Sequence, residues 1–490
     1  MSAGHTIVYL MIGAYALLTL LISLYGFKRE KNTPEDFFLA GRRVGPVVLF
    51  FTLVATNFSA FFFLGFAGAG YRIGYSYYGI MAFGTAFVAV AFYLVGDRVC
   101  RIGRAKGYMT PPELIGKSLN SKSLEMVYLA VMVIFTLPYL ALQPIGAGYI
   151  ISNLTDGEVP YFVAASLITA FIVLYVYLGG MRTVAWTDVL QGVMMFSLIA
   201  AALFMITRGM GGLGQANTQA LAQQPGLFSA QGMDQYYSPR KWFSFTLIWF
   251  LSVPMFPHIF MRFFIPRSAA SLRTTIAIYP IVTAILFLFP ITIGVLGHIP
   301  FPALEGQQAD QILPMMLGAY TPFWFETLVM VGALAAFMST MDSQLLALSS
   351  MLTRDVYQRG LMPSASHQSQ VLVGRLMVAV LALLGLALAY QPPATILEIA
   401  TQAFTGLSVL FPTTIATLYW SATRPLACLL SILTGEALLA GYATGLIPDS
   451  LTFGFLPLVP IVITSTAIVV LGSLLISRFK PVAEGVNLES

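Results

Sequence analysis

The chain has 490 residues, of which 58% are hydrophobic and only 9% are charged, and its mean hydropathy is +0.82. Ordinary soluble domains carry about a quarter charged residues, so this composition excludes a water-soluble protein and predicts a lipid bilayer as the solvent. The net charge of +5 does not indicate nucleic-acid binding, because the basic residues lie in short connections between apolar segments, where they act as a topology signal.

Thirteen segments are long and apolar enough to be membrane spans, each needing about 20 residues. The first is followed by Lys28-Arg29-Glu30-Lys31, the reverse of the charge order around a cleaved signal peptide, so it is predicted to stay as a spanning helix. An odd number of spans places the two termini on opposite sides of the membrane. The predicted spans are 6–27, 46–72, 76–97, 124–152, 160–180, 184–207, 242–264, 274–298, 321–351, 371–390, 395–420, 425–446 and 454–477.

The basic residues orient these spans. With the N-terminus outside, all of the 25 Lys and Arg residues except Arg72, Arg208, Arg240 and Lys241 fall in inner connections, Arg262 included. The positive-inside rule therefore predicts a multi-pass protein of the cell (inner) membrane with a cytoplasmic C-terminus. Two outer connections are expected: a partly ordered loop at 208–241, and a stretch at 305–320 that contains a short helix around 312–316.

Two predicted spans are interrupted at their middle. The second contains the polar run Ala55-Thr56-Asn57-Phe58-Ser59-Ala60, and the seventh contains Ser252-Val253-Pro254-Met255-Phe256-Pro257, in which each proline removes a backbone donor. Either could be an ordinary kink. With the first span set aside, however, each is the first helix of a group of five. Corresponding breaks in two halves are typical of an inverted-repeat transporter whose site lies at the membrane midplane.

The ninth span offers a partner for the breaks. Ala336, Ser339, Thr340 and Ser343 follow i, i+3, i+4, i+7 spacing and share one helix face. Their oxygen atoms suit a hard monovalent cation, although close helix packing also favours Ser and Thr. Asp342 in the same span, and Asp188 near the inner end of the sixth, are candidates for coupling, because a carboxylate within a membrane is costly and usually functional.

Three stretches resemble the sodium/solute symporter family, which includes bacterial proline, pantothenate and sialic acid transporters and the sodium/glucose cotransporters. The resemblance implies an all-α, leucine-transporter-type fold of five-plus-five inverted repeats, with one helix before the repeats and two after them. The stretches are Asp36-Phe37-Phe38-Leu39-Ala40-Gly41-Arg42, Gly179-Gly180-Met181-Arg182-Thr183-Val184-Ala185-Trp186-Thr187-Asp188-Val189-Leu190-Gln191, and Met338-Ser339-Thr340 through Ser349-Ser350 to Thr353-Arg354-Asp355-Val356-Tyr357.

The resemblance also divides the chain. Residues 1–45 would form the extra N-terminal helix and an inner loop, 46–207 the first repeat, and 208–241 the outer loop. The second repeat would cover 242–420, and two C-terminal helices with a tail would cover 421–490.

By this resemblance, sodium would be held by the backbone carbonyls of Ala55, Phe58 and Ala336 and the hydroxyls of Ser339 and Thr340. A second cation or coupling site would involve Asp188, Asp342 and Ser343. Asp342 stands where the family pattern has a hydroxyl, so it could bind sodium more strongly, take a proton or meet a basic side chain.

The resemblance also suggests a solute site. Phe61 and Phe62 stand where sugar-transporting members have polar side chains, which argues against a hexose. Tyr139 and Trp249 match aromatic residues of the proline-transporting branch, which shares Pro257-His258 and the following Arg262. Asn57 replaces an aspartate of that branch, and Gln143 and Gln402 would either face the cavity or form interhelical hydrogen bonds.

The sequence therefore predicts a sodium-coupled symporter that imports a small organic solute, with a small carboxylate or amino acid favoured. A sugar or vitamin as solute, and proton coupling, stay open as alternatives. A membrane enzyme fits less well, because none of the four histidines forms a metal-binding pair and Pro111 occupies the place of the leading glycine in a phosphate loop at Gly116-Lys117-Ser118. A channel fits less well because no repeated filter motif is present. The sequence carries no signal for an oligomeric state.

Overall fold

The computed structural model describes residues 3–28, 31, 33–392 and 394–479. Within these ranges the chain is helical, and its β-structure is one isolated bridge between Val44 and Pro266. The longer helices are α1 (Ala3–Phe27), α3 (Pro46–Asn57), α5 (Tyr75–Lys106), α7 (Lys122–Leu154), α8 (Tyr161–Gly209), α10 (Pro239–Ser252), α12 (Ala269–Leu296), α14 (Phe323–Met351), α15 (His367–Leu388), α16 (Ile396–Ser408), α17 (Leu410–Tyr419), α18 (Pro425–Ala443) and α19 (Leu458–Phe479).

Shorter helices connect or interrupt these. The π-helical turn η2 (Phe61–Gly65) and α4 (Phe66–Ile73) continue from α3, η5 (Val253–Met255) and α11 (Pro257–Met261) continue from α10, and the π-helical η7 (Leu352–Leu361) extends α14. The predicted outer loop at 208–241 contains α9 (Leu213–Gln223), and the short helix expected around 312–316 is present as α13 (Ile312–Tyr320). The remaining short α-helices are α2 (Pro34–Leu39) and α6 (Pro111–Ser118), and the remaining short turns of 3-10 helix are η1 (Ala40–Arg42), η3 (Pro225–Phe228), η4 (Met233–Gln235), η6 (Gly306–Gln311) and η8 (Asp449–Thr452).

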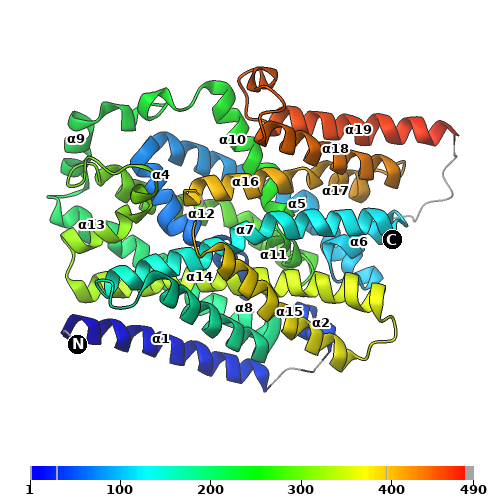
Figure 1. Ribbon diagram of the computed structural model, residues 1–490, viewed down its shortest axis with the longest axis horizontal. Coiled ribbons are helices and arrows are strands. Elements are labelled where there is room, and N and C mark those ends of the chain that lie inside the picture. Colours follow the sequence, from blue (N-terminus) through cyan, green and yellow to red (C-terminus); the bar gives the residue numbers. More distant parts are fainter. Residues whose placement is uncertain (1–2, 29–30, 32, 393, 480–490) are drawn as a thin grey trace.

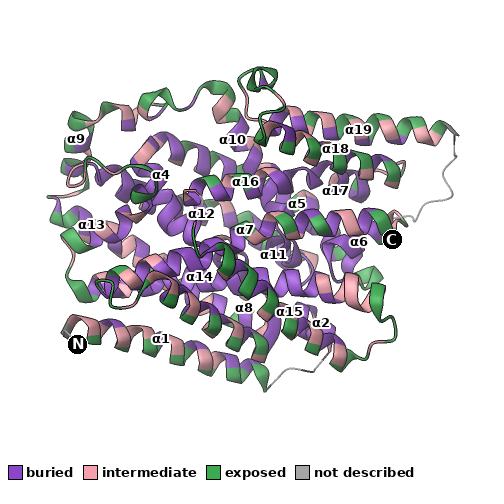
Figure 2. Ribbon diagram, in the orientation of Figure 1, coloured by how far each residue is buried: buried purple, intermediate pink, exposed green. Residues whose placement is uncertain are grey.

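The helices form a bundle around α14. This helix packs against α7 and α8, whereas α1 lies along α8 and α14 at one edge and the α18–α19 pair lies at the opposite edge (Figure 1). The start of α1 and the end of α19 lie at opposite ends of the bundle (Figure 1). The buried residues concentrate in α14 and its neighbours, whereas the outer helices alternate between buried and exposed (Figure 2).

The outer surface of the bundle is apolar. Leu10 on α1, Leu383 on α15 and Leu471 on α19 are 67%, 65% and 58% exposed. Exposing so many aliphatic side chains to water would be energetically unfavourable, whereas the hydrocarbon of a bilayer solvates them. The arrangement is that of an integral, multi-pass membrane protein.

The described chain contains ten helices that are long and apolar enough to cross a membrane, and an eleventh span forms if α3 is joined to η2 and α4, which are bent from it by 59°. The sequence predicted thirteen. One difference lies in α8, which is continuous by this measure although Gly180 (φ 54°, ψ −155°) breaks it where the fifth predicted span ends. The other is the seventh predicted span, whose pieces α10 and α11 are each too short. The count of thirteen stays a prediction.

Both predicted breaks are confirmed. After α3 ends at Asn57, Phe58 is extended (φ −101°, ψ 103°) before the chain resumes as the π-helical turn. After α10 and η5, Phe256 is extended (φ −61°, ψ 130°) before α11 begins at Pro257. The polar run and the prolines therefore interrupt the helices where the sequence indicated.

Helix α4 crosses α12 at very short range. A Cβ atom added to Gly294 would lie 2.0 Å from the Ala67 carbonyl oxygen, and one added to Gly70 would lie 2.4 Å from the Ile291 carbonyl oxygen. Both contacts are with backbone atoms, which cannot rotate away. Small residues let the two helix backbones meet, and this contact holds the helix beyond the first break in place.

We expect Gly294→Ala to lower the thermal stability of the protein, because the new methyl group would force α4 and α12 apart; overpacking costs at least about 1–3 kcal/mol. The matched control is Gly79→Ala on α5, since no atom lies within 4 Å of a Cβ at that position. Melting temperatures of the purified proteins in detergent would check this. Equal melting temperatures for the two variants would contradict the close crossing.

Candidate functional site

An oxygen cluster forms where the first break faces α14. The Ser339 Oγ lies 3.0 Å from the Ala55 carbonyl oxygen and 2.9 Å from that of Ala336. The Thr340 Oγ1 lies 3.2 Å from the Phe58 carbonyl oxygen. All five residues are completely buried. The structure thus brings together the five residues predicted to hold sodium.

The cluster contains one further oxygen that the sequence did not indicate. The Thr56 carbonyl oxygen lies 3.1 Å from the Thr340 Oγ1. It is free for this contact because α3 ends one residue later. Carbonyl and hydroxyl oxygens from an unwound helix and its neighbour are the groups that coordinate sodium in broken-helix carriers. A bound ion would take the lone pairs that now accept these hydroxyl protons.

Side chains stabilise the backbone that the first break leaves without helical partners. The Ala60 N–H donates to the Gln143 Oε1 at 3.1 Å, and the Phe61 N–H donates to the Ser59 Oγ at 3.1 Å. Gln143 is held in turn by the hydrogen bond from its Nε2 to the Tyr139 carbonyl oxygen, at 3.2 Å. Because an unpaired backbone group costs several kcal/mol in lipid, Gln143 and Ser59 are what makes the break tolerable.

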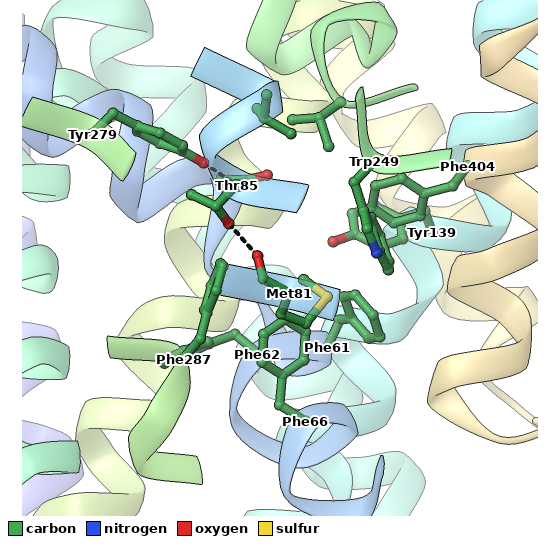
Figure 3. Close-up of a pocket in the computed structure, with 13 residues that line it drawn as sticks. Phe61, Phe62, Phe66, Met81, Thr85, Tyr139, Trp249, Tyr279, Phe287 and Phe404 are labelled. Carbon is green, nitrogen blue, oxygen red and sulfur yellow. Dashed lines mark hydrogen bonds between the residues drawn. The ribbon is translucent and has the colours of Figure 1, made fainter. Parts of the chain in front are cut away.

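A small cavity of about 30 Å³ lies beside the break. Rings on several helices enclose it, with Trp249, Tyr139 and Phe404 gathered on one side (Figure 3). A volume of this size holds one or two water molecules, so the cavity must widen to admit an organic solute. The lining residues are Asn57, Phe61, Phe62, Phe66, Met81, Thr85, Val88, Tyr139, Trp249, Val253, Tyr279, Phe287 and Phe404.

The lining includes five of the seven residues predicted for the solute, namely Asn57, Phe61, Phe62, Tyr139 and Trp249. The structure does not bring the two glutamines to the cavity. Gln402 is exposed on α16, and the buried Gln143 bonds to the break instead. Sequence reasoning missed the aromatic residues of α12 and α16, because nothing in an apolar span distinguishes a ring that faces a cavity from one that faces lipid.

The unwound segment touches both the oxygen cluster and the cavity. The Asn57 Nδ2 donates to the Tyr279 hydroxyl at 2.6 Å, and the Ser59 Oγ lies 3.0 Å from the Tyr139 hydroxyl. Between them, the Phe58 ring stacks on Phe62 with centroids 4.2 Å apart. Each residue from 57 to 59 therefore contacts a residue that lines the cavity, while the Phe58 carbonyl faces α14.

A buried charged cluster lies beside the oxygen cluster. Arg262 lies in the connection between α11 and α12, but its side chain is completely buried, and its Nη2 lies 3.3 Å from the Asp188 Oδ2. Asp188 also accepts a hydrogen bond from the Thr52 hydroxyl. The positive-inside rule counts charges near span ends and gives no information on where their side chains extend, so the sequence did not indicate that this side chain enters the bundle after the short helix α11.

Asp342 lies next to this pair but is not part of it. The Tyr175 hydroxyl donates to its Oδ2 at 2.7 Å, and the Ser343 hydroxyl donates to its Oδ1 at 3.1 Å. Among the described residues, no basic side chain lies within ion-pair distance of Asp342. The three residues predicted for a second cation or coupling site thus lie in one cluster, but a basic side chain pairs with Asp188.

A family model described as the sodium:solute symporter family matches residues 37–435. The chain belongs to this family. It is 27% identical over 423 residues to a sodium/proline symporter of Staphylococcus aureus (strain bovine RF122 / ET3-1), a match that covers 84% of this chain and 81% of the relative. Symport of a small organic solute with sodium as the coupled ion is therefore its function.

Two solved structures share the fold. A Na+-coupled sialic acid symporter in a substrate-bound, outward-open state superimposes with a TM-score of 0.81 at 18% identity, over 96% of this chain and 98% of that one. Mhp1, a nucleobase-cation-symport-1 family transporter in a closed conformation with bromovinylhydantoin bound, gives 0.64 at 13% identity, over 92% and 96%. The predicted all-α, leucine-transporter-type fold is confirmed.

We expect Gln143→Leu to weaken sodium binding as well as stability, because the Ala60 N–H would lose its partner at a cost of about 1–3 kcal/mol. Gln191→Leu is the matched control, since Gln191 is equally buried but bonds to the Tyr15 hydroxyl on α1 rather than to the backbone of the break. Melting temperature and half-maximal sodium concentration would both be measured. If the two variants had the same sodium dependence, Gln143 would have no role in shaping the break.

Proposed function

We propose that this symporter imports a small carboxylate or amino acid by alternating access. It would sit in the cell membrane with its N-terminus outside and its C-terminus in the cytoplasm. Sodium would be bound by the carbonyls of Ala55, Phe58 and Ala336 and the hydroxyls of Ser339 and Thr340. The solute would be held in the aromatic cavity beside them.

The observation that carries this proposal is the segment 57–59, which belongs to both sites. Sodium at the oxygen cluster fixes the backbone at Phe58, and that backbone places Asn57, the Phe58 ring and Ser59 against the cavity wall. A solute in the cavity fixes the same segment from the other side. Each ligand therefore favours the arrangement that the other needs, and this coupling is reciprocal.

The cavity favours a small solute with an apolar body and few polar groups. Its walls are aromatic and aliphatic, its polar side chains are Asn57, Thr85, Tyr139 and Tyr279, and none of the residues that line it is charged. A sodium ion at the neighbouring oxygen cluster would supply a positive charge for a carboxylate there. The similarity to sodium/proline symporters supports an amino acid.

A hexose is a poorer candidate. Phe61 and Phe62 line the cavity and offer its hydroxyl groups no hydrogen-bond partners. Each polar group buried without a partner costs about 1–3 kcal/mol. Transport measurements in proteoliposomes distinguish these alternatives. They separate a sugar or vitamin from an amino acid as the solute, and a proton from sodium as the coupled ion.

In proteoliposomes we expect accumulation of a small amino acid or monocarboxylate when a sodium gradient is directed inward, and none when potassium replaces sodium. The solutes are first screened for sodium-dependent thermal stabilisation of the purified protein, with sugars and vitamins in the same panel. Stabilisation by a sugar or vitamin alone would contradict the proposed solute class. Uptake that follows a pH gradient and ignores sodium would contradict sodium coupling.

Replacing Ser339 and Thr340 together with Ala should raise the sodium concentration for half-maximal uptake at least about tenfold, since each 1.4 kcal/mol of lost binding is tenfold in affinity. The matched control replaces Ser349 and Ser350, two buried hydroxyls about two and a half helical turns farther along α14. An unchanged sodium dependence in the Ser339 and Thr340 variant would remove these hydroxyls from the sodium site.

A further inference from the structure

One nitrogen of Arg262 lies among three oxygen atoms from three helices. The Arg262 Nη2 is 2.5 Å from the Ser343 Oγ, 3.0 Å from the Thr56 Oγ1 and 3.3 Å from the Asp188 Oδ2. All four side chains are completely buried. An arginine typically binds a carboxylate through two parallel hydrogen bonds. Arg262 does not bind Asp188 in this way, and both the Arg262 Nε and the Asp188 Oδ1 are without hydrogen-bond partners.

This geometry resembles a cation surrounded by oxygen atoms, rather than an arginine that forms two parallel hydrogen bonds with one carboxylate. We call the three oxygen atoms the oxygen cage. Two hydroxyls and a carboxylate oxygen around one point are ligands that a hard cation prefers. Here the positive charge among these oxygen atoms is the guanidinium group of Arg262, the residue that directly follows α11. A free ion cannot occupy the position while the Nη2 is there, because both would lie within hydrogen-bond distance of the same oxygens.

The cage is next to the oxygen cluster and shares a residue with it. Thr56 contributes its hydroxyl to the cage and its carbonyl oxygen to the contact with Thr340. Ser343 lies about one helical turn beyond Ser339 and Thr340 on α14. The oxygen cluster and the cage are therefore parts of one continuous polar interior. The cage already holds a positive charge, that of Arg262.

We propose that Arg262 is a tethered cation that replaces a second coupling ion, so that the protein binds one sodium ion per chain. This proposal rests on the proposed function, because it takes the oxygen cluster of α3 and α14 as the sodium site. Without the guanidinium, Asp188 is a buried carboxylate without a counter-charge, among hydroxyl oxygens that are free to coordinate. Such a carboxylate must bind a cation or take up a proton, and the oxygen atoms around it are those that a sodium ion prefers.

A merely structural ion pair makes a different prediction. If Arg262 and Asp188 only join helices, removing the arginine weakens the fold and creates no ion site. If Arg262 fills a cation site, removing it creates a second one that depends on Asp188. The number of bound sodium ions separates the two cases.

The experiment counts radiolabelled sodium bound at saturation to the purified full-length protein, without solute. We expect one ion per chain for the wild type, two for Arg262→Leu, and one again for Arg262→Leu combined with Asp188→Asn. Arg262→Lys keeps a tethered charge and should bind one. The matched control is Arg273→Leu, which removes an exposed arginine paired with Asp97 and should leave the count at one.

Two ions on the wild type, or one on a folded Arg262→Leu variant, would overturn the tethered-cation proposal. If Arg262→Leu does not fold, Arg262→Gln, which removes the charge but keeps hydrogen-bond donors, takes its place, and one ion on that variant overturns the proposal. Replacing Ser339 and Thr340 with Ala in the wild type tests the sodium site separately. In that variant the affinity for the single sodium ion should fall at least about tenfold, and an unchanged affinity would refute the oxygen cluster as the sodium site and leave the role of Arg262 to the other variants.

Discussion

The structure depends on one constraint, which is that backbone groups inside a bilayer must find partners within the protein. A continuous helix meets this need by itself, so a helix that stops at Asn57 must be supported from outside. The support comes from α7 through Gln143 and from α14 through the hydroxyls of Ser339 and Thr340. The groups that stabilise the break therefore also form a cluster of oxygen atoms. An alkali ion bound there would be coordinated by the carbonyl oxygens that now accept hydrogen bonds from the two hydroxyl groups.

Buried charge adds a second constraint on the same region. Asp188, Arg262 and Asp342 are all completely buried, and removing charges from water is costly unless they are paired. Asp188 has its partner in Arg262, whereas Asp342 is held by the hydroxyls of Tyr175 and Ser343. The chain from Thr52 through Asp188, Arg262 and Ser343 to Asp342 joins α3, α8, the segment after α11 and α14. A movement of the second broken helix would move the arginine and so change the charge balance beside the oxygen cluster.

Much of this could be predicted from the sequence, for physical reasons. A polar run or a pair of prolines inside an apolar span is conspicuous, so both breaks were visible, and the helical period placed Ala336, Ser339 and Thr340 on one face. The sequence could not show whether a given side chain extends into the bundle, into the cavity or toward the lipid. Arg262 was assigned to an inner connection because it lies near a span end, which gave no sign that its side chain enters the bundle. Gln402 was a candidate for the cavity because it is polar, with an interhelical hydrogen bond as the alternative. Phe404, which does line the cavity, is one of 37 phenylalanines in an apolar chain, and only the packing of α16 against α10 and η2 distinguishes it.

The most direct test of the account is whether sodium orders the broken helix. Hydrogen exchange of the purified protein would be compared in sodium chloride and in potassium chloride at equal ionic strength. We expect slower exchange in sodium for peptides that cover residues 54–63 and 336–343, with little change in α18 and α19. Identical exchange at 54–63 in the two salts would contradict it, because an ion bound by the carbonyls of this segment must restrict its backbone.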